Sequence, residues 1–419
     1  MTATVPALKF ALTPHRVALA LTAGRWRSDL RHGAAGSPLR YTEIPRPERP
    51  PGWVRIVPSL AGICASDRKM LTVTELGRPL LAFFGLPRQG IVPGHEVVGT
   101  VVEADADAGV REGDRVVAEP TLGCGHKGFP ACTRCAAGDD HRCEHQADAG
   151  GAAGPGFGFG FNARYGGGWA GELVAPAGQV HRVPDELDDR SAVLAEPTAV
   201  AVHAVLRTLP RPNQRAAVVG PGAIGISVLH ALSALAPEVD TTMIGLGDFA
   251  DHHARAGGAT HLLHGTHREL VEAAGALLGT TVRGGMLAGP ILEDGFDVVY
   301  DAVGSRQTMD DAVRMLRPGG TLVLLGTTAE QVLDWTLVWH RELTIRGSGY
   351  YGTEDVPAGA GVPAGRRRAF DIALEMLAER RPSDLVTHVF PLDEPVSALT
   401  TSASGPAAGA LKVVFAPQP

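Results

Sequence analysis

Four of the five cysteines in this chain are gathered in one short stretch, CGHKGFPACTRCAAGDDHRC. They follow the spacing C-x7-C-x2-C-x7-C and are Cys124, Cys132, Cys135 and Cys143. Four thiolates can close a tetrahedral shell around zinc and leave no open position, so the pattern predicts a structural zinc site at 124–143. The alternatives are unliganded thiols, two disulfides, or a shell in which His126 or His141 replaces a cysteine.

The fifth cysteine, Cys64 in GICASD, stands apart from this loop. His95 and Glu96 in PGHE and Glu196 in AEP offer groups of matching chemistry. One thiolate, one imidazole and one or two carboxylates are typical ligands of a zinc ion that keeps a free coordination position. Taken singly, a lone cysteine is most often a small buried apolar residue and a lone histidine a hydrogen-bonded core residue. The catalytic interpretation therefore depends on the surrounding sequence.

A glycine pattern in VVGPGAIG indicates a third kind of chemistry. Gly220, Gly222 and Gly225 have G-x-G-x-x-G spacing, with Ile224 between the last two. An apolar segment that reads as a strand precedes them and a helical segment follows. Glycines in this setting allow a tight turn and the close approach of a pyrophosphate to a helix N-terminus. We predict a dinucleotide site there, the alternative being an ordinary glycine-rich turn.

The ends of the neighbouring predicted strands carry the remaining coenzyme candidates. Gly245 lies where many such folds place an acidic residue for the ribose hydroxyl, and Asp248 follows three residues later. A missing carboxylate removes repulsion toward a 2′-phosphate, which favours NADP over NAD, although Asp248 could instead reach the ribose. Gly304, Leu325 and Gly326 end two further strands and are candidates to border the nicotinamide, or they are ordinary strand ends.

Length and composition limit the possible classes of protein. The 419 residues are enough for two domains, and they are 44% hydrophobic and 20% charged, with no apolar run long enough to cross a bilayer. A net charge of −7 gives no general attraction to nucleic acid or an anionic membrane. The first residues lack the pattern of a secretory signal, so we expect a cytoplasmic protein, in which clustered cysteines more often bind metal than form disulfides.

The periodicity of the chain changes near residue 198. Before that point short β segments separated by turns are expected at 52–64, 95–104, 113–120 and 171–184. After it, predicted strands alternate with helices, which indicates βαβ units on a parallel sheet. The expected strands are 216–220, 241–245, 296–304 and 321–327, and the helices are 223–236, 249–258 and 308–320. The tail adds a predicted helix at 366–380 and a β segment at 411–417.

Taken in order, these motifs resemble the zinc-dependent medium-chain dehydrogenase/reductase (alcohol dehydrogenase) family, and within it the polyol, or sorbitol-like, branch. The matching stretches, besides the cysteine loop, are GICASD, VPGHEVVGTVVE, GDRVVAEP, LAEPTAVAVHAV, GPGAIG, FDVVYDAVGS, LRPGGTLVLLG and ELTIRGS. The resemblance implies an α/β fold with a GroES-like, β-rich catalytic domain at 1–197 and a Rossmann doubly wound domain at 198–348. Residues 349–419 would return to complete the catalytic domain.

The resemblance also assigns roles to residues. Cys64 and His95 would bind a catalytic zinc, with Glu96 as the neighbouring carboxylate and Glu196 at the position where the polyol branch has a glutamate. The four cysteines of the loop would hold a second, structural zinc. Ser66 matches the hydroxyl that passes the substrate proton toward solvent, and Asp67 matches the carboxylate that orients the histidine ligand.

Three departures from the family pattern set this chain apart. The first two loop cysteines are usually separated by two residues and here by seven. Lys69 stands where many members end the proton relay with a histidine. The segment 71–90 is longer than usual and 151–169 is rich in glycine and aromatic residues, so both are expected to reshape the substrate pocket.

The function implied is hydride transfer between NAD or NADP and a secondary alcohol or ketone, which we expect to be a polyol, a cyclitol or a sugar-like molecule. Two alternatives stay open: a specialised reductase of an imine or conjugated carbonyl, and a nucleotide-binding protein without turnover. A zinc-finger module for nucleic acid is poorly supported, because the cysteine loop lacks basic surroundings. Family members are commonly dimers or tetramers, so a homodimer or homotetramer is expected.

Overall fold

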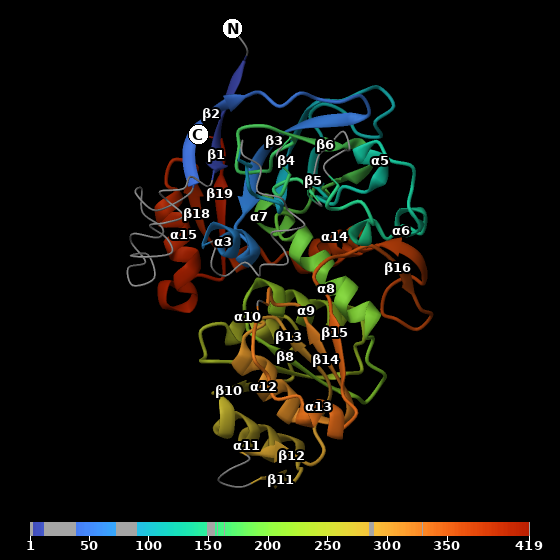
Figure 1. Cartoon of the computed structure of the whole chain (residues 1–419), viewed down its shortest axis with the longest axis vertical. Helices are drawn as coiled ribbons and strands as arrows, with labels where there is room; N and C mark the ends of the chain where they lie inside the picture. Colours follow the sequence, from blue (N-terminus) through green and yellow to red (C-terminus); the bar gives the residue numbers. More distant parts are fainter. Residues whose placement is uncertain are drawn as a thin grey trace. The chain divides into compact units, whose positions relative to one another are not determined.

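The computed structural model describes residues 3–11, 39–72, 90–148, 156, 158–162, 164–284, 289–328 and 330–418. The chain divides into two compact units, which Figure 1 shows coloured along the sequence. Unit 1 comprises Met1–Glu196 and Leu377–Pro419, and unit 2 comprises Pro197–Met376. Unit 1 is thus formed from both ends of the chain, whereas unit 2 is one continuous segment.

Unit 1 is built on a seven-stranded sheet with the order β18-β19-β3-β4-β5-β7, in which β6 also pairs with β3. These strands are β3 (Trp53–Gly62), β4 (Val97–Glu103), β5 (Arg115–Ala118), β6 (Leu173–Pro176), β7 (Val180–Arg182), β18 (Val386–Pro391) and β19 (Lys412–Ala416). All of these pairs are antiparallel except β18 with β19. The central strand β3 therefore has neighbours on both sides.

The other elements of unit 1 surround this sheet. A separate antiparallel ribbon is formed by β1 (Thr4–Phe10) and β2 (Leu39–Pro45). The helices are α3 (Ala65–Thr72), α5 (Cys124–Lys127), α6 (Thr133–Ala136), η2 (Asp140–Arg142), η3 (Ala177–Gln179), α7 (Asp189–Ala192), η4 (Ser383–Leu385), α15 (Pro395–Ser404) and η5 (Gly405–Ala408). Two further helices, α8 (Ala195–Arg207) and α14 (Ala369–Arg380), run across the boundaries between the units.

The sequence of β3 explains its central position. Val54 and Ile56 are fully buried and pack with Val97 and Val101 of β4 in one core cluster. Farther along the strand, Ala61 belongs to a second cluster. Apolar residues on both faces are typical of a strand that is covered on both sides. Burial thus fixes the register of β3, and with it the position of the residues that follow the strand.

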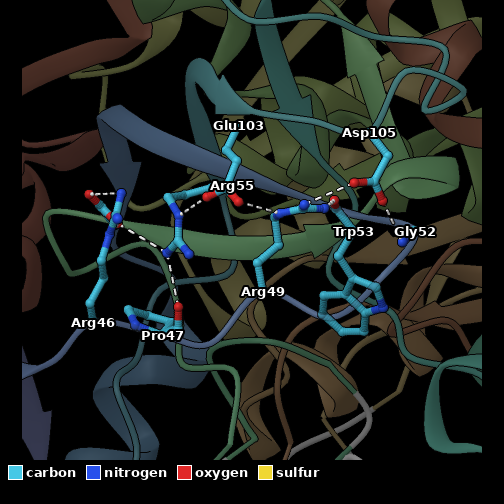
Figure 2. A network of polar contacts seen from close by, with 9 residues as sticks. Arg46, Pro47, Arg49, Gly52, Trp53, Arg55, Glu103 and Asp105 are labelled. Carbon is cyan, nitrogen blue, oxygen red and sulfur yellow. Dashed lines mark hydrogen bonds and ion pairs between the residues drawn. The ribbon is translucent and has the colours of Figure 1, made fainter. Parts of the chain in front are cut away.

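Arg55 interrupts this apolar run and is nevertheless buried. Its guanidinium binds Glu103 (Nε to Oε2, 2.8 Å) and Glu172 (Nη1 to Oε2, 3.1 Å), as Figure 2 shows in part. Arg49 continues the network to the other oxygen of Glu103 (2.9 Å) and to Asp105 (2.8 Å). Because each buried charge has an opposite partner, the network ties the 46–52 connection to the sheet instead of destabilising it.

Unit 2 contains a six-stranded, all-parallel sheet with the order β10-β9-β8-β13-β14-β15. The strands are β8 (Arg215–Val219), β9 (Asp240–Gly245), β10 (His261–His264), β13 (Phe296–Asp301), β14 (Leu316–Leu324) and β15 (Thr344–Gly347). The helices are α9 (Ala223–Leu235), α10 (Asp251–Ala256), α11 (His267–Leu278), α12 (Arg306–Met315) and α13 (Thr336–His340). Two small hairpins are β11 (Val282–Arg283) with β12 (Ile291–Leu292), and β16 (Thr353–Val356) with β17 (Gly365–Arg368).

Apolar residues fill the inner strands of this sheet, as expected where helices cover a parallel sheet. Ala217, Val219 and Val299 are buried in one cluster that also includes Leu270 and Val271 of α11. Strand order and parallel pairing are those of a Rossmann-type fold. The predicted fold class, a β-rich unit combined with a Rossmann-type α/β unit, is confirmed.

Several predicted boundaries were wrong in detail. The helix expected at 308–320 is α12, which begins after the capping box of Ser305 and Thr308 and ends at Met315. Leu316 already belongs to β14, and Pro318 and the positive φ of Gly319 (72°) do not suit a helix. The helix expected at 366–380 begins only at Ala369, because 365–368 pair with β16.

The second unit continues to Met376, beyond the boundary expected at 348. The hairpin of β16 and β17 accounts for this extension. Glu354 of β16 accepts a hydrogen bond from Gly352 N and contacts the buried His203 of α8 (Nδ1 to Oε1, 2.5 Å). In the part of the chain that the structure describes, no helix is both long and apolar enough to span a membrane.

Replacing Arg55 with methionine should lower the stability of unit 1 by about 2 kcal/mol, because Glu103 and Glu172 lose their shared buried partner. Arg46→Met is the matched control. Arg46 also pairs with Glu172 (2.7 Å), but its side chain is 42% exposed, and exposed ion pairs contribute at most about 1 kcal/mol. Urea unfolding followed by circular dichroism measures both losses. Equal losses of stability in the two variants would contradict the argument that a buried ion pair contributes more than an exposed one.

Candidate functional site

Three of the residues proposed for a catalytic metal meet at one end of β3. Cys64 follows this strand and precedes α3, while His95 and Glu96 immediately precede β4. One ligand atom from each of the three lies within 4.8 Å of the other two. His95 and Glu96 are buried and Cys64 is half-buried, so the group opens on the cysteine side. A thiolate, an imidazole and a carboxylate at this spacing fit zinc with a position left over.

Asp67 supports two members of this group at once. Its fully buried carboxylate accepts a hydrogen bond from Cys64 N (Oδ2, 3.0 Å) and faces Nδ1 of His95 (Oδ1, 3.3 Å). The second contact leaves Nε2 as the nitrogen that is available to a metal. Burial alone would lower the pKa of His95, but the Asp67 carboxylate raises that pKa well above its usual value. Asp67 thus has the geometry expected of an orienting carboxylate.

Glu196 lies close to this group without being one of its three members. It is the second residue of α8 and is half-buried. The pKa of Glu196 is raised to about 7, chiefly by burial and also by the nearby Glu96, while His95 opposes the shift. The structure therefore brings Glu196 into the electrostatic surroundings of the site, and its coordination of a metal stays a prediction.

The proposed proton relay begins on α3. Ser66 is half-buried in the first turn of this helix, two residues after Cys64, and Lys69 is half-buried one turn later. The roles suggested for the two residues stay predictions. Most of the unusual segment 71–90 lies outside the described residues, which resume at Gly90. The same applies to 151–155, 157 and 163 of the glycine-aromatic loop.

The four clustered cysteines come together as the spacing suggested, with ligand atoms within 4.8 Å of one another. Cys124 begins α5, Cys132 precedes α6, Cys135 lies within α6 and Cys143 follows η2. Each sulfur accepts a hydrogen bond from a backbone N–H at 3.4 Å. The donors are Cys132 for the sulfur of Cys124, Cys135 for Cys132, Cys124 for Cys135 and His145 for Cys143. Donors that surround four sulfurs stabilise thiolates, which is what a zinc shell requires.

The alternatives for this loop find less support. None of the five cysteines, all of which lie in described segments, forms a disulfide. His126 Nδ1 accepts a hydrogen bond from Gly123 N (3.3 Å), and neither His126 nor His141 belongs to the group of four ligand atoms. A backbone hydrogen bond from Glu144 lowers the pKa of Cys132 to about 6, whereas burial raises the pKa of Cys135 and Cys143. A bound cation would be needed to keep all four sulfurs deprotonated.

The glycines of the predicted coenzyme turn have different structural requirements. Gly220 has φ of 96°, which favours glycine, and a Cβ on Gly225 would overlap the carbonyl oxygen of Gly220. Gly222 precedes α9 with φ of −84°, and a Cβ there would meet nothing within 4 Å. The fold therefore requires glycine at 220 and 225 but not at 222. Open space beside Gly222, at the N-terminus of α9, is where a pyrophosphate would need close approach.

The other predicted coenzyme residues lie at the carboxyl ends of the parallel strands. Gly245 ends β9, and the exposed Asp248 follows it. Gly304 and Gly326 follow β13 and β14, and a Cβ on either glycine would overlap backbone atoms of the turn that holds the other. Leu325 is buried beside this pair. The two turns thus form one tightly packed edge of the sheet, where ligands of such folds bind.

The sequence did not point to two residues beside Cys64. Lys412, at the start of β19, forms a buried ion pair with Glu96. Gly62, the last residue of β3, leaves room for the Glu96 carboxylate, because a Cβ there would overlap Oε2. The sequence did offer one signal for Lys412, which is a charged residue directly before the apolar run VVFA. This signal alone does not indicate which residue the lysine contacts.

Gly222→Ala and Gly225→Ala form a matched pair that separates fold from binding. The Gly225 variant should lose about 1–3 kcal/mol of stability, because its methyl group overlaps a fixed carbonyl. The Gly222 variant should melt like the wild type but bind NAD or NADP at least about tenfold more weakly, since the methyl group occupies the space that the pyrophosphate needs. Thermal unfolding and coenzyme fluorescence titration measure both effects. Unchanged coenzyme affinity in Gly222→Ala would contradict the assignment.

Comparisons with known proteins agree with this arrangement. The alcohol dehydrogenase GroES-like domain family matches residues 50–185, and the zinc-binding dehydrogenase family matches residues 223–361. An L-threonine 3-dehydrogenase of Deinococcus deserti is 30% identical over 76% of this chain and 82% of its own length. An erythritol/L-threitol dehydrogenase of Mycolicibacterium smegmatis is 29% identical over 87% of this chain and 91% of its own length.

A solved structure extends the likeness to the fold of the whole chain. A cobalt- and zinc-bound thermostable alcohol dehydrogenase of Pyrobaculum aerophilum superimposes with a TM-score of 0.69, over 99% of this chain and 100% of its own, at 23% identity. At this identity the likeness concerns the fold alone. The family matches and the 30% identical relative show more. The chain belongs to the zinc-dependent medium-chain dehydrogenase/reductase (alcohol dehydrogenase) family and is an oxidoreductase.

Proposed function

We propose that this protein catalyses hydride transfer between a secondary alcohol or ketone and a nicotinamide coenzyme, at a catalytic zinc held by Cys64, His95 and a glutamate. The observation that carries the proposal is the group of Cys64, His95 and Glu96, whose ligand atoms lie within 4.8 Å of one another. The types of donor atom, the half-buried position of Cys64 and the support by Asp67 all suit a metal that must also bind a substrate.

The residues divide the work around that metal. Zinc in such a site supplies Lewis acidity that lowers the proton affinity of a substrate hydroxyl. Cys64 and His95 would hold the ion, and Asp67, which faces Nδ1 of His95, would leave Nε2 of that ring to bind it. Glu196, with a pKa near 7, is the second carboxylate proposed to reach the metal. Ser66, which is half-buried two residues after Cys64, would accept the proton of the substrate hydroxyl and pass it toward solvent.

The coenzyme is assigned to the glycine turn of unit 2. Backbone N–H groups at the start of α9 and the positive end of the helix dipole suit the pyrophosphate, and Gly222 leaves space for it. The turns of Gly304 and Gly326, with Leu325, are assigned to the nicotinamide. We favour NADP over NAD, because β9 ends in Gly245 rather than in an acidic residue that would repel a 2′-phosphate.

The proposed substrate is a polyol, a cyclitol or a sugar-like alcohol. Glu96 and Glu196 place two carboxylates around one metal site, which suits a molecule with several hydroxyl groups better than a simple alkyl alcohol. The name of one relative points the same way, since it is an erythritol/L-threitol dehydrogenase, whereas the L-threonine 3-dehydrogenase supports only a secondary alcohol. The polyol branch of the family is therefore the proposed placement.

An assay of coenzyme reduction tests this proposal directly. Purified zinc-loaded protein, with NAD or NADP and a pool of polyols, cyclitols and simple alcohols, should produce reduced nicotinamide, and division of the pool should lead to a polyhydroxy substrate. Cys64→Ser and His95→Ala should each lose at least about 1000-fold in kcat, because the metal and its Lewis acidity are lost. Full activity in either variant would refute zinc catalysis at this site.

Zinc content separates the two proposed metal sites. We expect about two zinc ions per chain in the wild type and about one in Cys64→Ser, whose cysteine loop is intact. Cys132→Ser should lose the other zinc and should also lower the melting temperature, because a closed zinc shell stabilises the loop around it. If bound coenzyme and zinc are present but no alcohol is oxidised, the reaction is better sought among imines and conjugated carbonyls.

We also propose that the chain assembles as a homodimer or homotetramer. Val332, Trp335 and Trp339 are large apolar residues within one short segment of unit 2, and their exposed fractions are 79%, 55% and 80%. Groups of exposed apolar side chains mark interaction surfaces. Strand β15, which follows this segment, is the edge of its sheet. Multi-angle light scattering should give the mass of two or four chains, and the mass of one chain would contradict the proposal.

A further inference from the structure

Lys412 is a buried cation that has no part in the mechanism above. It begins β19, and its side chain is only 4% exposed. Lysine is almost never fully buried unless it is paired. Its partner is the carboxylate of Glu96, which is itself buried. Removing the ammonium group of Lys412 from water costs free energy, and the contact with Glu96 offsets this cost. We therefore infer that this contact has a specific role.

The contact is directed at one oxygen of Glu96. Lys412 Nζ forms an ion pair with Glu96 Oε2 and also donates to the carbonyl oxygen of Ile63 (3.3 Å). The Glu96 side chain is 2% exposed, so water does not compete for this oxygen. Because the Ile63 carbonyl belongs to the backbone that leads from β3 to Cys64, the ammonium group is held by the same segment that carries the cysteine.

Gly62 lies against the same oxygen of Glu96. A Cβ on Gly62 would overlap Oε2 of Glu96, so this oxygen lies directly against the backbone of β3. The amide of Gly62 in turn donates to the backbone oxygen of Glu96 (2.8 Å). The contacts of Lys412 and Gly62 are therefore both made with Oε2, and we assign Oε1 as the oxygen that would bind a metal beside Cys64 and His95. A carboxylate held in this way can coordinate a metal through one oxygen but not through both.

We propose that Lys412 is a positioning residue that limits Glu96 to one coordinating oxygen and so keeps a position of the metal open for the substrate. This inference rests on the proposed function, since it presupposes a metal at Cys64 and His95. Without Lys412, Glu96 would turn Oε2 toward the metal and bind through both oxygens. The metal would still be held, but the position that a substrate needs would be filled by the protein itself.

Cobalt substitution tests this proposal, because the visible absorption of Co²⁺ reports its coordination number. The spectrum of the Cys64 site is obtained by subtracting that of Cys64→Ser, which keeps the cysteine loop. We expect Lys412→Met to bind as much cobalt as the wild type, with the weaker absorption of a higher coordination number. Its kcat/KM should fall about tenfold or more, while coenzyme affinity is unchanged.

A double variant distinguishes positioning from a merely structural role. An amide side chain cannot chelate through two oxygens, so Lys412→Met combined with Glu96→Gln should give the spectrum of Glu96→Gln alone. If the double variant instead keeps the spectrum of Lys412→Met, Lys412 acts only on the structure. Lys412→Arg preserves the cation and should restore the wild-type spectrum. Lys412→Gln, which loses only the charge, carries the same prediction as Lys412→Met if the methionine variant does not fold.

The outcomes separate this inference from the function on which it rests. A wild-type spectrum in cobalt-loaded Lys412→Met overturns the inference and leaves the proposed function intact. If wild type and Cys64→Ser give the same cobalt spectrum, no metal binds at Cys64, and the proposed function fails together with the inference.

Discussion

The pairing of β3 with β4 on one side and with β19 on the other is the constraint on which the candidate site depends (Figure 1). At the end of β3, Gly62 N donates to Glu96 O (2.8 Å) and Ile63 N donates to Val413 O (3.0 Å). These two bonds bring three distant segments of the chain together within one sheet. Cys64, Glu96 and Lys412 each lie within one residue of this junction, so a shift of register in either pair would separate them.

The two candidate metal sites are stabilised in different ways. In the cysteine loop each sulfur accepts a backbone N–H, so short helices alone can stabilise the thiolates. The Cys64 group depends on charged side chains, with Asp67 behind His95 and Lys412 behind Glu96. Backbone donors suit a metal shell that is closed by four protein ligands. Side chains can also orient the ligands of a metal that keeps one coordination position open. The contrast follows the division into structural and catalytic sites that the sequence suggested.

Sequence reasoning found the fold class and most residues of the candidate site because their signals are local. The cysteine spacing, the PGHE motif and the glycine turn each lie within a few residues. Lys412 was missed because its partner Glu96 is far away in sequence and only the sheet brings them together. Likewise, the spacing G-x-G-x-x-G does not reveal that packing requires glycine at 225 but not at 222. Helix 308–320 was predicted too long because the strand pairing of Leu316 is non-local.

Unit 1 is formed from two separate segments of the chain, and this has a consequence for folding during synthesis on the ribosome. Unit 2 is one continuous segment and can fold as soon as it has emerged. Unit 1 needs β19, and the first half of the chain must therefore wait, with an open edge on β3, until residues near 412 have been synthesised. Newly made chains are vulnerable to strand addition by other chains during this interval. Insertion of the last strand completes the sheet and brings the ammonium group of Lys412 to the Glu96 carboxylate in one step.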